Sequence, residues 1–335
     1  MSSLPPAGVP AHADVPPSAG TAAPPVLAEV VRSGFVEGRH RGSLVVLAAD
    51  GSVQQALGDV TSPVYPRSAN KPVQAAAVLH AGLDLAGERL ALAAASHSGE
   101  AFHLELVERM LGEYGLSEAD LQCPPDHPLD PEEQAAHAAA GRPRARIVMN
   151  CSGKHTAMLA ACERNGWPRD SYLTPGHPLQ QLVAERLAAL SGEPIAHTGT
   201  DGCGAPLLAI SLTGLARTFR AVALAGARTP EGRVAAAMRA HPEYIAGTRR
   251  HDTWLMRELP GTLSKMGAEA VQAVALPDGR ALAFKIEDGS VRALAPVLAR
   301  VLRSVDVHIP LLDRLAEAPL LGGDARVGEI RAAAF

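Results

Sequence analysis

The chain contains very little lysine. Its 335 residues include 31 lysine and arginine side chains, of which only four are lysine: Lys71, Lys154, Lys265 and Lys285. Arginine therefore supplies nearly all of the positive charge. A lysine that persists against this bias is expected to do what arginine cannot, which is to lose its proton and act as a base or a metal ligand. The first three stand beside serine, cysteine or glycine, whereas Lys285 lies in an alternating strand pattern and is interpreted as structural.

Other features are scarce too, and each scarcity argues against a class of protein. Aromatic residues make up 3% of the chain, so alanine, leucine and valine must build the core. No apolar run reaches about 18 residues, so no membrane partner is expected. The net charge of −4 and the lack of a basic block argue against nucleic-acid binding. The four cysteines have no disulfide-framework spacing, which favours a cytoplasmic chain with reduced thiols.

The composition divides the chain into a tail and a folded part. Residues 1–25 are rich in proline, alanine, serine and glycine, and they have neither a basic start nor a long apolar stretch. They predict a disordered tail rather than a signal peptide. Residues 26–335 are long enough for one domain built from two intimate lobes.

Apolar periodicity predicts strands near both chain ends and helices between them. Strands are predicted at residues 43–48, 53–57, 195–200, 269–276 and 281–287. Helices are predicted at residues 72–80, 85–95, 101–113, 132–140, 155–164, 178–190, 206–217, 230–240, 251–258 and 291–304. This order favours an α/β fold with one antiparallel sheet, in which the terminal segments meet, packed against a helix-rich region.

A serine and a lysine stand three residues apart where a helix is predicted to begin. The spacing of Ser68 and Lys71 places both side chains on one helix face. A neutral lysine there can take the proton of the hydroxyl and make it a nucleophile. Ser-x-x-Lys is the acylation motif of class A β-lactamases and penicillin-binding proteins. The plain alternative is that Ser68 only caps a surface helix.

Two later segments follow in the order of the remaining motifs of those enzymes, Ser-x-Asn and Lys-Thr-Gly. They are Ser96-His97-Ser98 and Lys265-Met266-Gly267, and both depart from the pattern. A second hydroxyl would relay a proton to the leaving group, and a second ammonium would keep the first lysine neutral by repulsion. Ser98 competes with Ser96 for the hydroxyl role, and a helix-end cap is the alternative for the whole segment.

Two cysteines about 50 residues apart each lie in a glycine-containing turn, which is typical of a zinc site. They are Cys151, in Cys151-x-x-Lys154, and Cys203, in Asp201-x-Cys203. Either Lys154 as a neutral amine or Asp201 is a candidate third ligand. The alternative is a pair of buried structural cysteines.

Six segments that occur in order resemble the rhizobial-type L-asparaginases, also called the asparaginase II family. The segments are Tyr65–Pro72, Ala95–Glu100, Asn150–His155, Asp201–Pro206, Gly247–Thr253 and Lys265–Glu269. The resemblance runs from about residue 28 to residue 325 and leaves the tail without a counterpart. It implies a β-lactamase-like fold, a catalytic domain of the asparaginase II type over residues 26–335, a homodimer, and hydrolysis of L-asparagine to L-aspartate and ammonia.

The resemblance also implies roles for particular residues. Ser68 would be the nucleophile with Lys71 as base, and Ser96 would pair with Lys265. Zn²⁺ would be held by Cys151, Lys154 and Cys203, and the substrate by Arg67, His97, Asp201 and Asp252. Two alternatives from other classes stay open. One is a β-lactamase or peptidase, and the other is a non-catalytic zinc-dependent binding protein.

Overall fold

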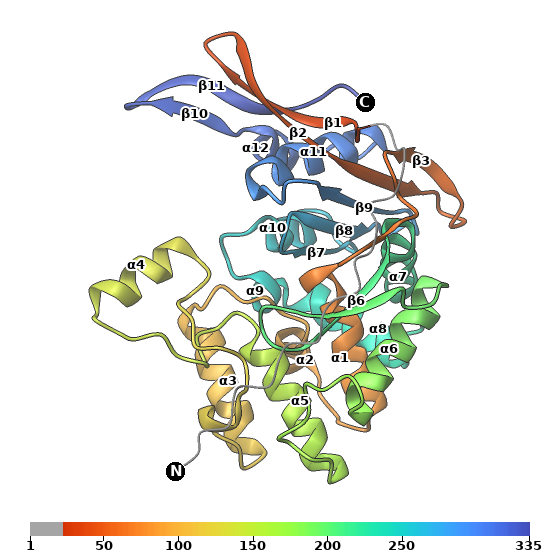
Figure 1. Ribbon diagram of the computed structural model, residues 1–335, viewed down its shortest axis with the longest axis vertical. Coiled ribbons are helices and arrows are strands. Elements are labelled where there is room, and N and C mark those ends of the chain that lie inside the picture. The colour runs from red at the N-terminus through yellow and green to blue at the C-terminus, as the bar shows by residue number, and fades with distance from the viewer. Residues whose placement is uncertain (1–22) are drawn as a thin grey trace, which may run out of the picture.

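The largest element of the fold is one antiparallel sheet. A computed structural model describes residues 23–335, and its main sheet has eight strands in the order β10-β11-β1-β2-β9-β8-β7, with β3 paired to β2. The strands are β1 (Val26–Arg32), β2 (Phe35–Leu47), β3 (Val53–Leu57), β7 (Leu263–Gly267), β8 (Val271–Ala275), β9 (Ala281–Ile286), β10 (Pro319–Gly322) and β11 (Ala325–Ala332). The sheet is curled and packs against helices, so the predicted α/β class is confirmed (Figure 1).

The helices occupy both faces of this sheet. They are α1 (Lys71–His80), α2 (Gly87–Ala93), α3 (Ala101–Glu113), α4 (Pro131–Ala139), α5 (Ser152–Asn165), α6 (Pro178–Ser191), α7 (Leu212–Leu224), α8 (Pro230–Ala240), α9 (Pro242–Ala246), α10 (His251–Glu258), α11 (Leu294–Ser304) and α12 (Leu311–Ala316). Short 3₁₀ helices are η1 (Arg67–Asn70), η2 (Glu118–Asp120) and η3 (Val291–Ala293). Figure 1 shows α11 and α12 within the curl of the sheet, while most of the other helices form the body below it.

Alternate side chains of β2 pack into two different apolar clusters. Leu44 and Val46 belong to the apolar cluster that contains α11 and α12, whereas Val45 and Leu47 belong to the larger cluster that contains α1 and α7. Successive side chains of a strand point to opposite faces. Both faces of the central sheet are therefore buried, and the site-bearing helices are fixed against one of them.

The two ends of the described chain meet in the sheet, as predicted. Strand β1 pairs with β11 in antiparallel register, with Ala28 opposite Ala332 and Val30 opposite Ile330. The predicted tail falls mainly on residues 1–22, which lie outside the described residues. Within residues 23–335 no helix is long and apolar enough to cross a membrane. All four cysteines are free and buried.

The predicted helix at residues 206–217 is wrong at its start. Residues Pro206–Ser211 form strand β6, which lies between β4 (Pro63–Val64) and β5 (His197–Thr200) in a small second sheet. All six residues are buried, and a short apolar run has no periodicity that separates strand from helix. Helix α7 begins only after Ser211, whose hydroxyl accepts the backbone N–H of Gly214 as an N-cap.

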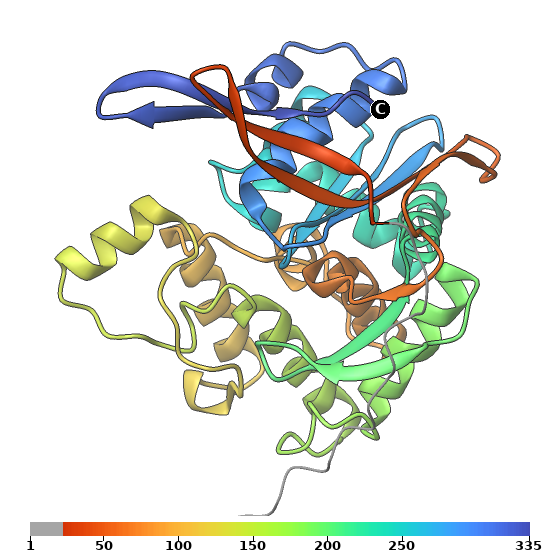
Figure 2. The same ribbon diagram turned by 45° about the horizontal axis from the view of Figure 1, so that its top comes forward.

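Helix α4 belongs to an arm that projects from the body. Both ribbon views show α4 standing away from the other helices on one side of the molecule (Figure 2). Most of its residues are exposed. Its first turn is capped by Asp130, whose side chain accepts the backbone N–H groups of Glu132 and Glu133.

Candidate active site

Ser68 lies in a tight turn against which strand β7 packs. It is half-buried within η1, three residues before α1 begins at Lys71, so the predicted single α-helix that carries both Ser68 and Lys71 is wrong. Arg67 has a left-handed backbone with φ of 51°. Gly267 of β7 packs onto this turn so closely that a Cβ there would lie 2.5 Å from the Pro66 carbonyl oxygen. Only glycine allows the strand to approach the Ser68 turn to this distance.

The amine of Lys71 is buried and donates to three acceptors. Its Nζ lies 2.6 Å from the Ala95 carbonyl oxygen, 2.8 Å from Ser96 Oγ and 3.0 Å from Cys151 Sγ. Three acceptors suit an ammonium; a neutral amine would donate only two and would accept a hydrogen bond from Ser96. The hydrogen bonds of Lys71 do not include one to Ser68, and catalytic contacts of this kind often shorten only when substrate binds.

Ser96 is shared between two lysines. Lys265 Nζ lies 3.1 Å from Ser96 Oγ and 2.8 Å from the Met266 carbonyl oxygen, and its side chain is fully buried. Burial, together with the charges of Lys71 and Arg250, lowers the pKa of Lys265 well below its usual value, although the carboxylate of Asp252 opposes this. We expected Lys265 to be the cation that keeps Lys71 neutral. The structure instead disfavours the ammonium of Lys265.

Ser98 takes a different position from Ser96. Its hydroxyl is fully buried and donates to the carbonyl oxygen of Ala246, at the end of α9. A Cβ on Gly247 would lie 2.1 Å from Ser98 Oγ, so the segment after α9 closes directly over it. Of the two serines in this segment, only Ser96 is hydrogen-bonded to lysine side chains.

The thiols of Cys151 and Cys203 come together as the spacing predicted. The hydrogen bond between them raises the pKa of Cys151 and lowers that of Cys203, and the ammonium of Lys154, 3.1 Å from Cys203 Sγ, adds to the lowering. Burial opposes the ammonium of Lys154, but the two sulfurs outweigh it and raise the pKa of Lys154. These surroundings therefore favour the thiolate of Cys203 beside the ammonium of Lys154.

His155 directs an unpartnered nitrogen into the same region. Its Nδ1 lies 2.6 Å from the Tyr172 hydroxyl, whereas its Nε2 is buried without a hydrogen-bond partner among residues 23–335. Burial lowers the pKa of His155 to about 4, so the ring is neutral. Two sulfurs, an amine and a neutral imidazole suit a zinc ion by donor chemistry. The described residues contain no group of three His, Cys, Asp or Glu side chains placed to hold a metal, so lysine would have to complete the set.

The four residues expected to bind substrate have different surroundings. Arg67 pairs with Asp201 at 2.9 Å and lies 3.8 Å from Glu269, at the edge of a 380 Å³ cavity. His97 is fully buried and hydrogen-bonds Ser152 Oγ at 2.8 Å. Asp252 is fully buried as well.

Asp252 holds the strand that carries Lys265. Its carboxylate accepts from Ser264 Oγ at 2.6 Å and from the Met266 backbone N–H at 2.9 Å. Burial acts to raise the pKa of Asp252, but the charges of His251 and Arg250 and the hydrogen bond from Ser264 lower it below its usual range. A charged Asp252 therefore fixes both neighbours of Lys265 in the strand.

Arg250 is a site residue that the sequence did not single out. Its Nη1 donates to the carbonyl oxygen of Ser96 at 2.7 Å. Arginine is abundant in this chain, so nothing in composition distinguishes Arg250 from the other arginines. Its place beside Arg249 in the Gly247–Thr253 motif was the only available signal.

Comparison with protein families gives the class of the protein. The family model described as L-asparaginase II matches residues 28–332. This match covers most of the chain, so the protein belongs to the asparaginase II family, as the resemblance of its six motifs predicted.

Similar solved structures share low sequence identity with the chain. Mglu in its native form is 14% identical with a TM-score of 0.43, over 81% of this chain and 65% of that chain. A β-lactamase from Mycobacterium bovis is 15% identical with a TM-score of 0.43, over 79% of this chain and 95% of that chain. A Bacillus glutaminase is 12% identical with a TM-score of 0.44, over 80% and 92%. The comparison with curated proteins finds no match.

Proposed function

We propose that the protein hydrolyses L-asparagine to L-aspartate and ammonia through an acyl-enzyme on Ser68. The observation that carries this proposal is Ser96 Oγ between Lys71 Nζ at 2.8 Å and Lys265 Nζ at 3.1 Å. Two buried lysines bridged by one hydroxyl can hold a single proton between them, and such a unit can take a proton and return it. Family membership supports the amide as the bond that is cleaved.

The proposed chemistry moves one proton in each half of the reaction. Lys265, whose lowered pKa makes it the neutral partner at the start, first takes the proton of Lys71 through Ser96. Ser68 Oγ then attacks the side-chain amide carbon of asparagine, and the neutral Lys71 accepts the hydroxyl proton. The same unit protonates the departing nitrogen, and ammonia leaves. Water then attacks the ester of Ser68 and gives its proton to the lysine pair, which passes it to Ser68 Oγ as the C–Oγ bond breaks and aspartate leaves.

We also propose that Cys151, Lys154 and Cys203 hold a zinc ion. The thiolate at Cys203, its contact with Lys154 at 3.1 Å, and the unpartnered Nε2 of His155 support this set. A bound zinc would supply a fixed positive charge that orients substrate. Asp201 Oδ2 lies 3.9 Å from Cys203 Sγ and would neighbour the metal rather than replace Lys154. The homodimer implied by the resemblance stays a prediction.

An ammonia-release assay tests the proposed substrate. Purified protein should release ammonia from L-asparagine much faster than from L-glutamine, and it should release amino acids from β-aspartyl peptides only slowly. Nitrocefin turnover with no asparaginase activity would instead favour the β-lactamase alternative. Absence of turnover on every amide, together with stoichiometric zinc, would favour the non-catalytic binding protein.

A further inference from the structure

Gln272 is a buried polar residue in the middle of an apolar strand. It lies in β8, whose five residues are all buried, and its own side chain is fully buried. Its Nε2 donates to Asp252 Oδ1 at 3.1 Å, to Ser264 Oγ at 3.0 Å and to the Ala273 carbonyl oxygen at 3.3 Å. A buried amide is costly unless its polar groups are hydrogen-bonded, so the partners of Gln272 indicate what it does in this strand.

These partners allow only one orientation of the amide. The Ala273 carbonyl and the Asp252 carboxylate can only accept, so the amide nitrogen must face them and the amide oxygen must face His251. His251 Nε2 lies 2.9 Å from Gln272 Oε1 and is therefore the ring nitrogen that carries a proton. Gln272 thus joins the imidazole of His251 at one end to the carboxylate of Asp252 at the other.

The carboxylate of Asp252 is held by both of its oxygens. Oδ1 accepts from Ser264 Oγ at 2.6 Å as well as from Gln272, and Oδ2 accepts the backbone N–H that follows Lys265 in β7, at 2.9 Å. Among residues 23–335 its ion-pair partner is His251, 3.6 Å from Oδ1, and not Lys265. The oxygens of Asp252 are therefore engaged by these donors rather than by the amine of Lys265.

Four ionisable groups act on the amine of Lys265. Burial lowers the pKa of Lys265, and the cations of Lys71, in α1, and Arg250, at the start of α10, lower it further. Asp252, in α10, and Cys151, at the start of α5, act to raise this pKa, and Asp252 has the larger effect of the two. The placement of the Asp252 carboxylate therefore decides how strongly an ammonium is favoured at Lys265.

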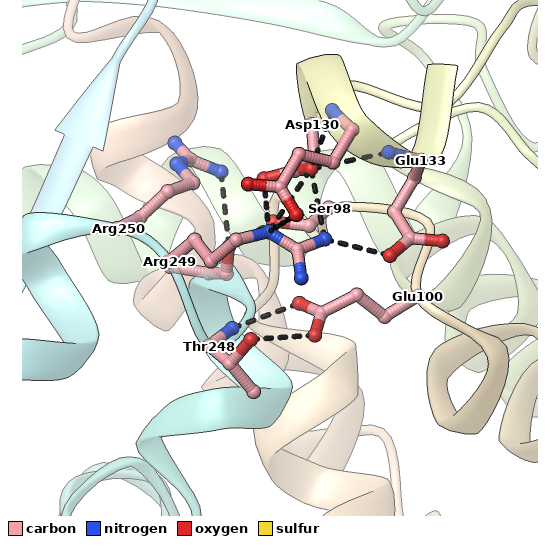
Figure 3. A network of polar contacts seen from close by, with 9 residues as sticks. Ser98, Glu100, Asp130, Glu133, Thr248, Arg249 and Arg250 are labelled. Atoms are coloured by element: carbon pink, nitrogen blue, oxygen red, sulfur yellow. Dashed lines mark hydrogen bonds and ion pairs between the residues drawn. The ribbon is translucent and has the colours of Figure 1, made fainter. Parts of the chain in front are cut away.

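Arg250 carries a positive charge that forms no ion pair within residues 23–335. Figure 3 shows the neighbouring Arg249 hydrogen-bonded to Asp130 and Glu133, with Arg250 directed the other way. Arg250 donates instead to the carbonyl oxygen of Ser96 at 2.7 Å. Its charge therefore acts against a further ammonium beside Ser96.

We propose that Gln272 is a positioning residue that, together with Ser264, keeps the Asp252 carboxylate out of an ion pair with Lys265. Lys265 then stays neutral and can take the proton of Lys71. Without Gln272, the negative charge of Asp252 would be less dispersed by hydrogen bonds, and an ammonium at Lys265 would be favoured. The role in proton transfer rests on the proposed function, whereas the arrangement of Asp252 rests on its hydrogen bonds alone.

The scarcity of lysine makes the charge of Lys265 measurable by NMR. Protein labelled with ¹³C at lysine Cε contains four labelled side chains, and the signal that is absent from Lys265→Met belongs to Lys265. This signal is followed from about pH 5 to about pH 10 in the wild type and in Gln272→Met. Its titration midpoint should be higher in Gln272→Met by about one pH unit or more, because Asp252 loses a hydrogen bond to its charged group.

Thr253→Val is the matched control for loss of a buried polar group. Thr253 is fully buried and follows Asp252 in α10, but its hydroxyl donates to backbone carbonyl oxygens instead of the Asp252 carboxylate. The Lys265 midpoint in Thr253→Val should equal that of the wild type. An unchanged midpoint in folded Gln272→Met, or an equal shift in Thr253→Val, would overturn the inference.

Ser264→Ala keeps the test decisive if Gln272→Met does not fold. It removes the other side-chain donor to Asp252 Oδ1, so the Lys265 midpoint should again rise. A folded Ser264→Ala protein whose Lys265 titrates as in the wild type would overturn the inference as well.

The pH profile of turnover tests the role in proton transfer separately. The rising limb of kcat/KM for L-asparagine should move to higher pH in Gln272→Met, by the same shift as the Lys265 midpoint, and turnover should recover at high pH. Equal loss of kcat/KM at every pH would show a merely structural role and overturn the positioning role. If the wild type releases no ammonia from asparagine at any pH, the proposed function fails, and the NMR titration still decides on the arrangement of Asp252.

Discussion

Lys71 and Cys151 are joined by a hydrogen bond of 3.0 Å, although 80 residues separate them. The same amine lies 2.8 Å from Ser96 Oγ, so one lysine contacts both the serine relay and the pair of thiols. The serine–lysine motifs and the cysteine–lysine motifs, which are separate in the sequence, are therefore parts of one buried polar cluster. Substitution of a thiol is therefore expected to alter the hydrogen bonding of the serine relay through Lys71.

Ser68→Ala should abolish turnover and leave the fold intact. Only a half-buried hydroxyl is removed, and loss of a nucleophile typically costs about 10⁴-fold or more in kcat. Steady-state ammonia release and the thermal unfolding midpoint are compared with those of the exposed control Ser62→Ala. A folded Ser68→Ala protein with more than about a tenth of wild-type turnover would exclude Ser68 as the nucleophile.

Ser96→Ala should mainly reduce kcat, whereas Ser98→Ala should mainly reduce the stability of the fold. Ser96→Ala removes the hydroxyl between the lysines, so kcat should fall by about 10² to 10⁴, as for loss of a proton relay. Ser98→Ala leaves the carbonyl oxygen of Ala246 with only the long 3.4 Å hydrogen bond from Arg250 and should reduce the free energy of unfolding by about 1–3 kcal/mol. Chemical denaturation and kcat are measured for both. Greater loss of kcat in folded Ser98→Ala than in Ser96→Ala would reverse the assignment.

The sequence predicted local elements better than contacts between them. Helices α3 and α8 match their predicted bounds, α3 through its apolar periodicity and α8 through its Thr229 N-cap. Strands β1, β10 and β11 were not predicted; they pair with one another, and β1 also pairs with β2, so segments from both ends of the chain form this part of the sheet. The local sequence pattern of a strand does not predict which other strand it pairs with.

In the site, too, local motifs were easier to predict than contacts between distant segments. Ser68, Lys71 and the two cysteines could be proposed from the sequence because each lies in a short segment with its own chemical signature. Arg250 was missed because its contact with the carbonyl oxygen of Ser96 joins segments far apart in the sequence. The lowered pKa of Lys265 was also missed, because the depth of burial of Lys265 follows from tertiary packing.

Lys71→Arg should be nearly as damaging as Lys71→Ala. Arginine retains the positive charge but keeps its proton, so it cannot accept one from Ser68. Ammonia release by both variants is compared at matched folded concentration, judged by circular dichroism. Recovery of substantial activity in the arginine variant alone would show that Lys71 serves as a fixed cation, and the base role would pass to Lys265.

The pH dependence of stability should report on Lys265. Its pKa is lowered in the folded protein, whereas the unfolded value is about 10.4, so between these values the unfolded state holds more protons. Stability contributed by this group therefore rises as pH rises through that window. Thermal midpoints of the wild type and Lys265→Met are measured from about pH 6 to about pH 10. The difference, wild type minus variant, should increase with pH, and a flat or falling difference would show that Lys265 is charged in the folded protein.

Zinc binding should depend on Cys151, Lys154 and Cys203 together. Protein purified without chelator should contain about one zinc per chain, because two sulfurs and an amine leave one position of a tetrahedral ion open. Affinity should be moderate and should rise with pH, since zinc must displace protons from its ligands. The fold should survive chelation, because the two large apolar clusters do not need a metal to form. Elemental analysis of Cys203→Ser should show loss of zinc, whereas Cys162→Ser, which changes a buried cysteine outside the cluster, should retain it. Unchanged zinc in Cys203→Ser, or sub-stoichiometric zinc in the wild type after soaking with the ion, would contradict the site.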